Sequence, residues 1–304
     1  MATIHGDKNW FFKDDELVGT TNADWIYGLD GKDVLFGRDG NDRLYGGSHD
    51  DRLYGEDGRD TLRGEWGNDR LYGGAGNDTF IDINGTDLMS DGTGVDSVDY
   101  SGFYGRVTVD LTQGTAVQRE AIYHLDSGML FHYVDTDTLR SIEDVKGAQF
   151  DDVLSGNASA NRLEGGTGAD TLNGRGGNDV LIGGSDTDRL TGGAGLDTFV
   201  FDRSVTPNNP VTITDFRHAD DTIQLDGAFF TALGRGEVSE RAFKITDTYD
   251  ASDLDVSDRI VVSTWNNLVF YDADGSGSAF DPVAIARMTQ TAVASIAADD
   301  FLVV

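Results

Sequence analysis

Aspartate recurs every nine residues in two parts of this 304-residue chain. Thirteen nonapeptides share the pattern G-G-x-G-x-D-x-U-x, in which U is a large apolar residue, and twelve of them have aspartate at the sixth position. Carboxylates are the charged oxygen ligands that hard divalent cations prefer, and backbone carbonyls can complete a set of six or more ligands. The predicted carboxylate ligands are Asp24, Asp33, Asp42, Asp51, Asp60, Asp69, Asp78, Asp152, Asp170, Asp179, Asp188 and Asp197.

Glycine is the second regular feature of these repeats. It occupies the first position in all thirteen repeats and the fourth position in eight. Glycine reaches positive φ, and without a Cβ it lets backbone carbonyls crowd around an ion. We therefore assign the turns of the metal sites to Gly28, Gly31, Gly37, Gly40, Gly46, Gly55, Gly58, Gly64, Gly67, Gly73, Gly76, Gly165, Gly168, Gly174, Gly177, Gly183, Gly192 and Gly195.

These aspartates and glycines also have a purely structural explanation, because both residue types favour tight turns. However, aspartates at one phase would repel one another in strands stacked about 4.8 Å apart, unless cations lie between them. Metal binding is therefore the better interpretation. Calcium is favoured over magnesium, which keeps its waters and avoids sites built only from protein ligands.

The eighth position must hold the elements together. It is always apolar, from Ile26 to Phe80 in the first block and from Leu154 to Phe199 in the second. An x-U-x triplet forms a short strand with one side chain pointing inward, and stacked triplets form a thin core. Two nonapeptides complete one turn, so repeat n lies on repeat n+2 and the aspartates form two edges. Counting stacked pairs predicts roughly nine ions; the sites near Asn161, His49 and Asp186 depart from the pattern.

The composition excludes several classes of protein. The net charge is −31, from 54 acidic and 23 basic residues. Nucleic acids and anionic membranes need a basic face, so neither is an expected partner. Three prolines beside 40 glycines exclude collagen, and the absence of cysteine excludes disulfides and thiolate metal sites. Residues 1–17 contain no apolar core of a signal peptide, and no stretch is long enough to span a membrane.

The repeats resemble those of the RTX (repeats-in-toxin) family of exported bacterial proteins. GRDGNDRLY at 37–45, GGAGNDTFI at 73–81 and GGAGLDTFV at 192–200 carry the resemblance. It implies right-handed parallel β-rolls, calcium as the cofactor, and export through a type I secretion apparatus with an uncleaved signal near the C-terminus. The sequence 298–304 (ADDFLVV) is similar to the ends of such chains, although it could equally form a closing edge strand.

The expected fold is all-β, with two parallel β-rolls joined by metal-free β rungs with a hairpin, and a C-terminal β-rich cap. The expected divisions are a lead-in over 1–18, the first roll over 19–82, a connector over 83–146, the second roll over 147–202, and a cap with secretion signal over 203–304. The nine-residue phase is expected to be lost from residue 83, because Gly19 and Gly147 are not separated by a multiple of nine.

Segments outside the repeats have their own signatures. Residues 122–125 and 129–134 flank Asp126-Ser127-Gly128, which predicts a hairpin. This hairpin contains Tyr123, His124, Phe131, His132 and Tyr133, and we favour cross-strand packing over a carbohydrate or partner patch or a metal site of two histidines.

In the last third, strands are predicted over 211–216 and 221–225, a hairpin over 259–264 and 268–271, and a short helix over 283–297. The loop 272–277 begins like an EF-hand but has Val283 where a glutamate ligand should stand, so a polar turn is the better interpretation.

No catalytic residue is predicted. The chain has neither the H-E-x-x-H motif of zinc proteases nor the G-x-S-x-G motif of lipases. The favoured hypothesis is a secreted, extracellular, non-enzymatic calcium-binding protein that folds on meeting calcium and acts in surface attachment, matrix or host interaction, with a polysaccharide or cell-surface partner. The alternative is an extracellular enzyme or polysaccharide-modifying unit with its site in 83–146.

Overall fold

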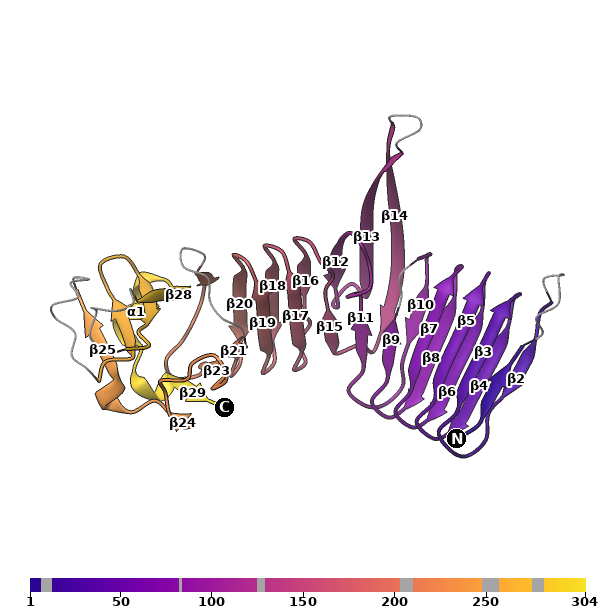
Figure 1. The fold of residues 1–304 in the computed structure, drawn as a ribbon, viewed down its shortest axis with the longest axis horizontal. Helices are drawn as coiled ribbons and strands as arrows, with labels where there is room; N and C mark the ends of the chain where they lie inside the picture. Colours follow the sequence, from indigo (N-terminus) through magenta and orange to yellow (C-terminus); the bar gives the residue numbers. More distant parts are fainter. Residues whose placement is uncertain (7–12, 82–83, 125–128, 203–209, 248–256, 275–281) are drawn as a thin grey trace. The chain divides into compact units, whose positions relative to one another are not determined.

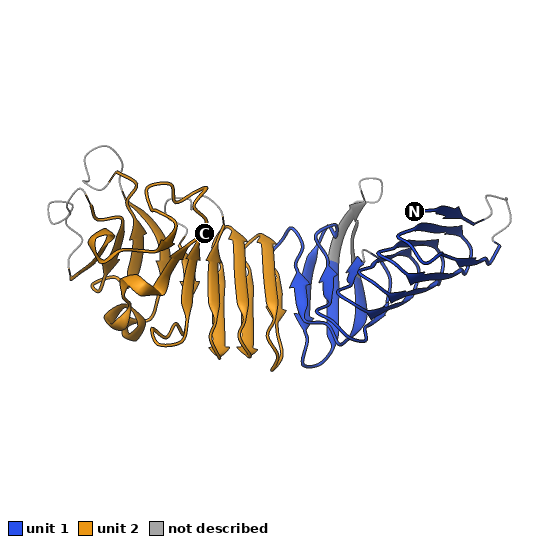
Figure 2. Cartoon of the chain, turned by 90° about the horizontal axis from the view of Figure 1, so that it is seen from below, with its two compact units in different colours: residues 1–150 blue, residues 151–304 orange. Residues whose placement is uncertain are grey.

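The structure, a computed structural model, describes residues 1–6, 13–81, 84–124, 129–202, 210–247, 257–274 and 282–304, and of 120–133 it describes no side chains. It divides into two compact units, residues 1–150 and 151–304 (Figure 2). The boundary falls inside the first nonapeptide of the second block. Within the described residues, no helix has the length and apolar character needed to cross a membrane.

The first unit consists of stacked turns with strands on two sides (Figure 1). On one side the strands pair in parallel in the order β1 (Thr3–His5), β3 (Trp25–Asp30), β5 (Arg43–Ser48), β7 (Thr61–Trp66), β9 (Thr79–Ile81), β11 (Ser97–Asp99) and β15 (Asp144–Lys146). On the other side the parallel strands are β2 (Glu16–Val18), β4 (Val34–Asp39), β6 (Arg52–Asp57), β8 (Arg70–Ala75), β10 (Leu88–Ser90) and β14 (Met129–Arg140), followed by antiparallel β13 (Thr115–His124) and β12 (Arg106–Asp110).

The second unit repeats this arrangement with fewer turns. Its first side consists of parallel β17 (Arg162–Thr167), β19 (Val180–Ser185), β21 (Thr198–Phe201), β23 (Thr222–Leu225) and β29 (Phe301–Val303), with antiparallel β24 (Gly236–Glu237) beside β29. Its second side consists of parallel β16 (Val153–Ser155), β18 (Thr171–Gly176), β20 (Arg189–Ala194), β22 (Val211–Ile213) and β28 (Val283–Arg287). Antiparallel β27 (Leu268–Tyr271) and β26 (Ile260–Ser263), and then β25 (Phe243–Thr246), continue that side.

The strand register confirms the predicted all-β solenoid with two nonapeptides per turn. Ile26 pairs with Leu44 and Leu44 with Leu62, each 18 residues apart. The eighth-position side chains are fully buried, so each unit has a core one side chain thick. Such a thin core buries little apolar surface per turn. The turns at its edges must therefore contribute to the stability of the fold.

The nine-residue phase does not end at residue 82, and the prediction that it does is wrong. β10 pairs with β8 and β11 pairs with β9, with Met89 and Val98 fully buried at the eighth position. Asp87 and Asp96 stand at the sixth position of these two additional repeats. The phase was hidden because Asp82 and Asp91 replace glycine at the first position.

The predicted hairpin is confirmed as β13 and β14, which extend beyond the stacked turns (Figure 1). Its backbone register places His124 opposite Met129 and His132 opposite Ala121, so the two histidines are not cross-strand partners. The side chains from Tyr123 to Tyr133 lie outside the described part of the chain.

The end of the second unit departs from the prediction in one element. Residues 283–287 form strand β28, and only α1 (Gln290–Ser295) is helical, because β28 is held between β22 and β27. The helix begins where the Thr289 side chain accepts the backbone N–H of Ala292 at 3.2 Å. The predicted hairpin of β26 and β27 is confirmed. Strand β29 lies between β23 and β24, so the end of the chain is an interior strand of that sheet.

Aromatic side chains at the ninth position form ladders on the outside of the first unit. Tyr27 stacks on Tyr45 with ring centroids 4.7 Å apart, and Tyr54 lies 5.1 Å from Phe36 and 4.9 Å from Tyr72. Near-parallel stacking uses the ring faces within the ladder and adds about 0.5–1.5 kcal/mol per pair. In the second block the ninth-position residues are Ser155, Glu164, Asn173, Ile182, Thr191 and Val200. The ninth-position ring ladders of the described residues therefore belong to the first block, and the second block has no aromatic residue at that position.

Candidate metal centre

The repeat aspartates form continuous rows along the edges of both units. In the first row, the backbone N–H groups of Asp24, Asp42 and Asp60 each donate to Oδ1 of the aspartate 18 residues later, at 2.7 Å. The second row, on the other edge, has the same pattern. The first row is Asp24, Asp42, Asp60, Asp78 and Asp96, and the second is Asp33, Asp51, Asp69 and Asp87. In the second unit the rows are Asp152, Asp170 and Asp188, and Asn161, Asp179, Asp197 and Asp221.

The structure therefore brings the predicted aspartates together, and it adds three that the sequence analysis missed: Asp87, Asp96 and Asp221. The first two could have been found from their phase. Asp221 lies 24 residues after Asp197, so an intervening segment of irregular length hides it.

The second oxygen of these carboxylates is the chemically important one. All row aspartates are almost completely buried. Oδ1 is used by the neighbouring turn, whereas Oδ2 is buried without a hydrogen-bond partner. This holds for Asp33, Asp42, Asp51, Asp60, Asp78, Asp170, Asp179, Asp188 and Asp197. A buried anionic oxygen without a partner is costly, and a coordinated cation removes that cost.

Without a bound cation, the aspartate carboxyl groups of the rows resist ionisation. Burial, together with the charges of Asp69 and Asp33, raises the pKa of Asp51 to about 8. Burial likewise raises the pKa values of Asp60, Asp170 and Asp188 to about 7. At neutral pH the rows therefore hold a proton or a metal ion in place of full negative charge.

The pH dependence of the calcium-free protein follows from these shifts. The folded carboxyl groups have pKa values above the unfolded value of about 3.9, so the folded state binds more protons across the interval. Stability is thus fully present below about pH 4 and is lost as the pH rises through about 6 to 8. We expect protein dialysed free of calcium to show more β-structure by circular dichroism at pH 5 than at pH 8. More β-structure at pH 8 would contradict the raised pKa values.

The first-position glycines are required for space. A Cβ on Gly28 would lie 2.4 Å from the carbonyl oxygen of Gly46 and 2.5 Å from Oδ2 of Asp33. These two oxygens therefore face the same small space beside the glycine. The first-position glycines do not have positive φ angles, so the expectation of left-handed backbone at the first position is wrong. The left-handed positions are the second and the fourth, as at Gly47 (φ +116°) and Gly58 (φ +152°).

Three departures from the repeat pattern keep the backbone conformation. His49 and Asp186, at the fourth position, have φ of 81° and 80°. Asn161 donates its N–H to Asp179 Oδ1 at 2.8 Å, like the aspartates. Its side-chain oxygen accepts the N–H of Asn157 at 2.8 Å, so an amide replaces a carboxylate at the start of that row.

The second row ends at Asp137, whose carboxylate accepts hydrogen bonds from protein donors. The N–H of Asp87 donates to Oδ1 of Asp137 at 3.1 Å, and Asp137 is fully buried. Its Oδ2 accepts the hydroxyl of Tyr100 at 3.0 Å and the amide of Gln118 at 2.9 Å. Donors from the connector therefore satisfy the last carboxylate, a closure that no repeat pattern could predict.

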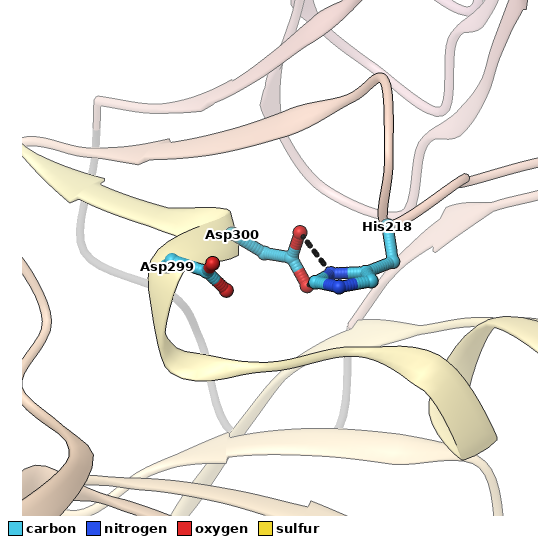
Figure 3. A group of neighbouring side chains, drawn as sticks. All are labelled: His218, Asp299 and Asp300. Carbon is cyan, nitrogen blue, oxygen red and sulfur yellow. Dashed lines mark hydrogen bonds and ion pairs between the residues drawn. The ribbon is translucent and has the colours of Figure 1, made fainter.

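A separate cluster joins the last strand to a turn in the second unit (Figure 3). His218 Nδ1 lies 2.9 Å from both carboxylate oxygens of Asp300, and the N–H of Ala297 donates to Oδ2 of Asp300 at 2.7 Å. Asp300 raises the pKa of His218 by hydrogen bonding and by its charge. Asp299 lies nearby and is exposed. Both carboxylate oxygens of Asp300 are thus used by His218 and Ala297. The cluster holds the 3-10 helix Ala298–Asp300, which leads directly into β29, against the turn that carries His218.

The EF-hand-like loop falls partly outside the described residues, which end there at Asp274. The N–H of Asp274 donates to Oδ1 of Asp272 at 3.1 Å, as in a polar turn.

The RTX calcium-binding nonapeptide repeat matches the sequence in four copies, over residues 13–44, 45–80, 146–181 and 164–199. No curated protein matches the sequence. Among solved structures, two subunits of the Azotobacter vinelandii mannuronan C5-epimerase, AlgE6R3 and AlgE6R2, are 25% and 26% identical, each over 51% of this chain. The matches cover 78% and 88% of those subunits, both with a TM-score of 0.33. The extracellular lipase LipA from Serratia marcescens is 19% identical, covering 91% of this chain and 40% of that one, with a TM-score of 0.31.

Proposed function

Given that the two blocks are RTX calcium-binding nonapeptide repeats, we propose that this is a secreted calcium-binding protein that completes its folding outside the cell. One observation carries the proposal. Rows of buried carboxylates use one oxygen to join successive turns and leave the other in a space lined by carbonyl oxygens. Calcium takes six to eight oxygen ligands of these two kinds.

Coupling between folding and calcium follows from this arrangement. Without the ion, the turns must either bury charge or hold protons on carboxyl groups such as Asp51. The many glycines of the turns add an entropic cost to folding. The cell interior has little free calcium, so the chain stays open there. At extracellular millimolar calcium, modules of modest affinity, about 0.1–1 mM, fill and close the turns. An open chain suits passage through a narrow type I export channel.

The proposed role outside the cell is non-enzymatic attachment, through a polysaccharide or another cell-surface partner. Among the described residues, functional groups are densest in the carboxylate rows, and in this proposal those groups bind the calcium that completes folding. Both outer sides of the first unit remain available, with rings and exposed arginines such as Arg43, Arg52 and Arg70 set at regular intervals. Bound calcium offsets the negative charge of the carboxylate rows, and guanidinium groups on the outer sides pair with carboxylates and sulfates. An acidic glycan is therefore the matching class of partner once calcium is bound.

A glycan array tests this role. We expect the folded protein to bind acidic glycans in millimolar calcium and to lose this binding when a chelator removes the calcium. The double variant Arg52→Gln/Arg70→Gln should bind at least about tenfold more weakly, whereas Arg189→Gln, an exposed arginine on the second unit, serves as the matched control. Equal binding by all variants would contradict the proposed surface. Turnover of a polysaccharide, lipid or peptide in calcium would contradict the non-enzymatic role.

A further inference from the structure

An aspartate interrupts the glycine pattern at the end of the first roll. Asp91 follows β10 (Figure 1) and occupies the first position of its nonapeptide, where all thirteen repeats of the two blocks have glycine. Carboxylate oxygens of Asp78, Asp91 and Asp96 all lie within 4.8 Å of one another. Asp78 and Asp96 belong to the first row, so Asp91 adds a third carboxylate between two stacked turns.

The carboxylate of Asp91 stands where a carbonyl stands elsewhere. A Cβ on Gly55 would lie 2.4 Å from Oδ2 of Asp60 and 2.6 Å from the carbonyl oxygen of Gly73. One turn later, a Cβ on Gly73 would lie 2.5 Å from Oδ2 of Asp78 and 2.5 Å from Oδ2 of Asp91. A charged ligand has therefore replaced a neutral one at the same place.

Asp91 directs one carboxylate oxygen into this space, where Asp78 and Asp96 are its neighbours. Its Oδ1 accepts the N–H groups of Gly74 at 2.9 Å and Gly92 at 2.6 Å. Its Oδ2 is buried without a hydrogen-bond partner, and the same is true of Oδ2 of Asp78, a residue that is 1% exposed. Burial raises the pKa of Asp91 and brings that of Asp96 to about 6. Two buried carboxylates and the half-buried Asp91 repel one another in this space unless a cation lies among them.

The second unit offers an instructive contrast. Asp215 approaches Gly192 and Gly193 as Asp91 approaches Gly73 and Gly74, but both of its oxygens are used. Oδ1 accepts the N–H of Gly192 at 3.0 Å and Oδ2 accepts the N–H of Gly193 at 2.8 Å. Asp215 is thus a backbone cap, whereas Asp91 caps with one oxygen and presents the other to the row.

We infer that Asp78, Asp91 and Asp96 form a three-carboxylate calcium site at the end of the first roll, and that it fills before the sites within the rows. The inference rests on the proposed calcium binding and extends it to a site of which Asp91 and Asp96 lie beyond the matched repeats. Ligand charge count raises calcium affinity, because a third carboxylate adds a full charge at bonding distance. This site then fixes the last turns of the roll at calcium levels that leave the other sites empty.

Calcium titration of the full chain by isothermal calorimetry tests the site. The wild type should show one ion bound at least about tenfold more tightly than the rest. Asp91→Asn keeps the hydrogen bonds of Oδ1 but removes the charge, and it should abolish that tight phase while the weaker phase remains. Asp215→Asn makes the same change at the backbone cap and should leave the tight phase intact.

The outcomes separate the two levels of the account. A tight phase that survives Asp91→Asn, or the absence of any tight phase beside normal weak binding, overturns the third-carboxylate site and leaves calcium binding in the rows standing. No calcium binding by the wild type overturns both. If Asp91→Asn does not fold, Asp91→Gly decides, since it restores the repeat pattern: it should fold and bind with weak sites only, and a tight phase in it would overturn the site.

Discussion

Asp60→Asn is expected to have opposite effects with and without calcium. Asp60 accepts the N–H of Asp42 through Oδ1, and an asparagine oxygen keeps that bond. In calcium the variant loses the buried anionic Oδ2. Because each ion is expected to take an aspartate from both stacked turns, the Asp60 carboxylate is expected to serve the sites on either side of it in the row. We expect the loss of about two bound ions and a midpoint of calcium-induced folding raised about tenfold.

Without calcium the same change removes a carboxyl group whose pKa is raised to about 7. The neutral amide needs no proton to be buried, so at pH 8 the calcium-free variant should retain at least as much β-structure as the calcium-free wild type. Asp57→Asn is the matched control, because Asp57 is an exposed aspartate of strand β6. Parallel calcium titrations monitored by circular dichroism measure both effects. A loss of stability of equal size in calcium and in its absence would show that Asp60 has only a structural role.

Gly177→Ala is expected to prevent closure of the second roll. Gly177 has φ of +104°, and a Cβ would lie 2.3 Å from the carbonyl oxygen of Ser159 in the preceding turn. The backbone at Ser159 cannot move away from this Cβ without separating the two stacked turns. The free energy of unfolding should therefore fall by about 3 kcal/mol or more.

The neighbouring glycine supplies the control for that variant. A Cβ on Gly176 would lie 3.7 Å from the nearest oxygen, that of Ala194, which is an ordinary contact. Gly176→Ala should therefore change the free energy of unfolding by less than about 1 kcal/mol, measured by urea denaturation in saturating calcium. Equal effects of the two substitutions would contradict the stacking geometry.

The sequence predicted the solenoid because its two constraints are periodic. Apolar residues at the eighth position and aspartates at the sixth recur at one spacing, and stacking n on n+2 follows from the number of strands in a turn. Asp87 and Asp96 obey the same spacing, but they were missed because glycine at the first position was treated as essential. The structure explains why it is dispensable there: Asp91 supplies in its side chain the oxygen that a glycine carbonyl supplies elsewhere.

Features that depend on distant contacts could not be predicted. The closure of the second row requires Tyr100 and Gln118 to meet Asp137, and the pin on the last strand requires His218 to meet Asp300. Neither pair has a fixed spacing. Residues 283–287 are a short apolar run that fits strand or helix, and the neighbouring strands β22 and β27 decide between them.

The central claim is that calcium between the carboxylate rows holds the turns closed. Circular dichroism of the full chain at pH 7.5, first dialysed free of calcium and then titrated to millimolar calcium, tests it most directly. The account predicts a largely disordered spectrum that converts cooperatively to β-structure, and no conversion with magnesium at the same concentration. A β-rich spectrum at pH 7.5 that is identical with and without calcium would contradict it.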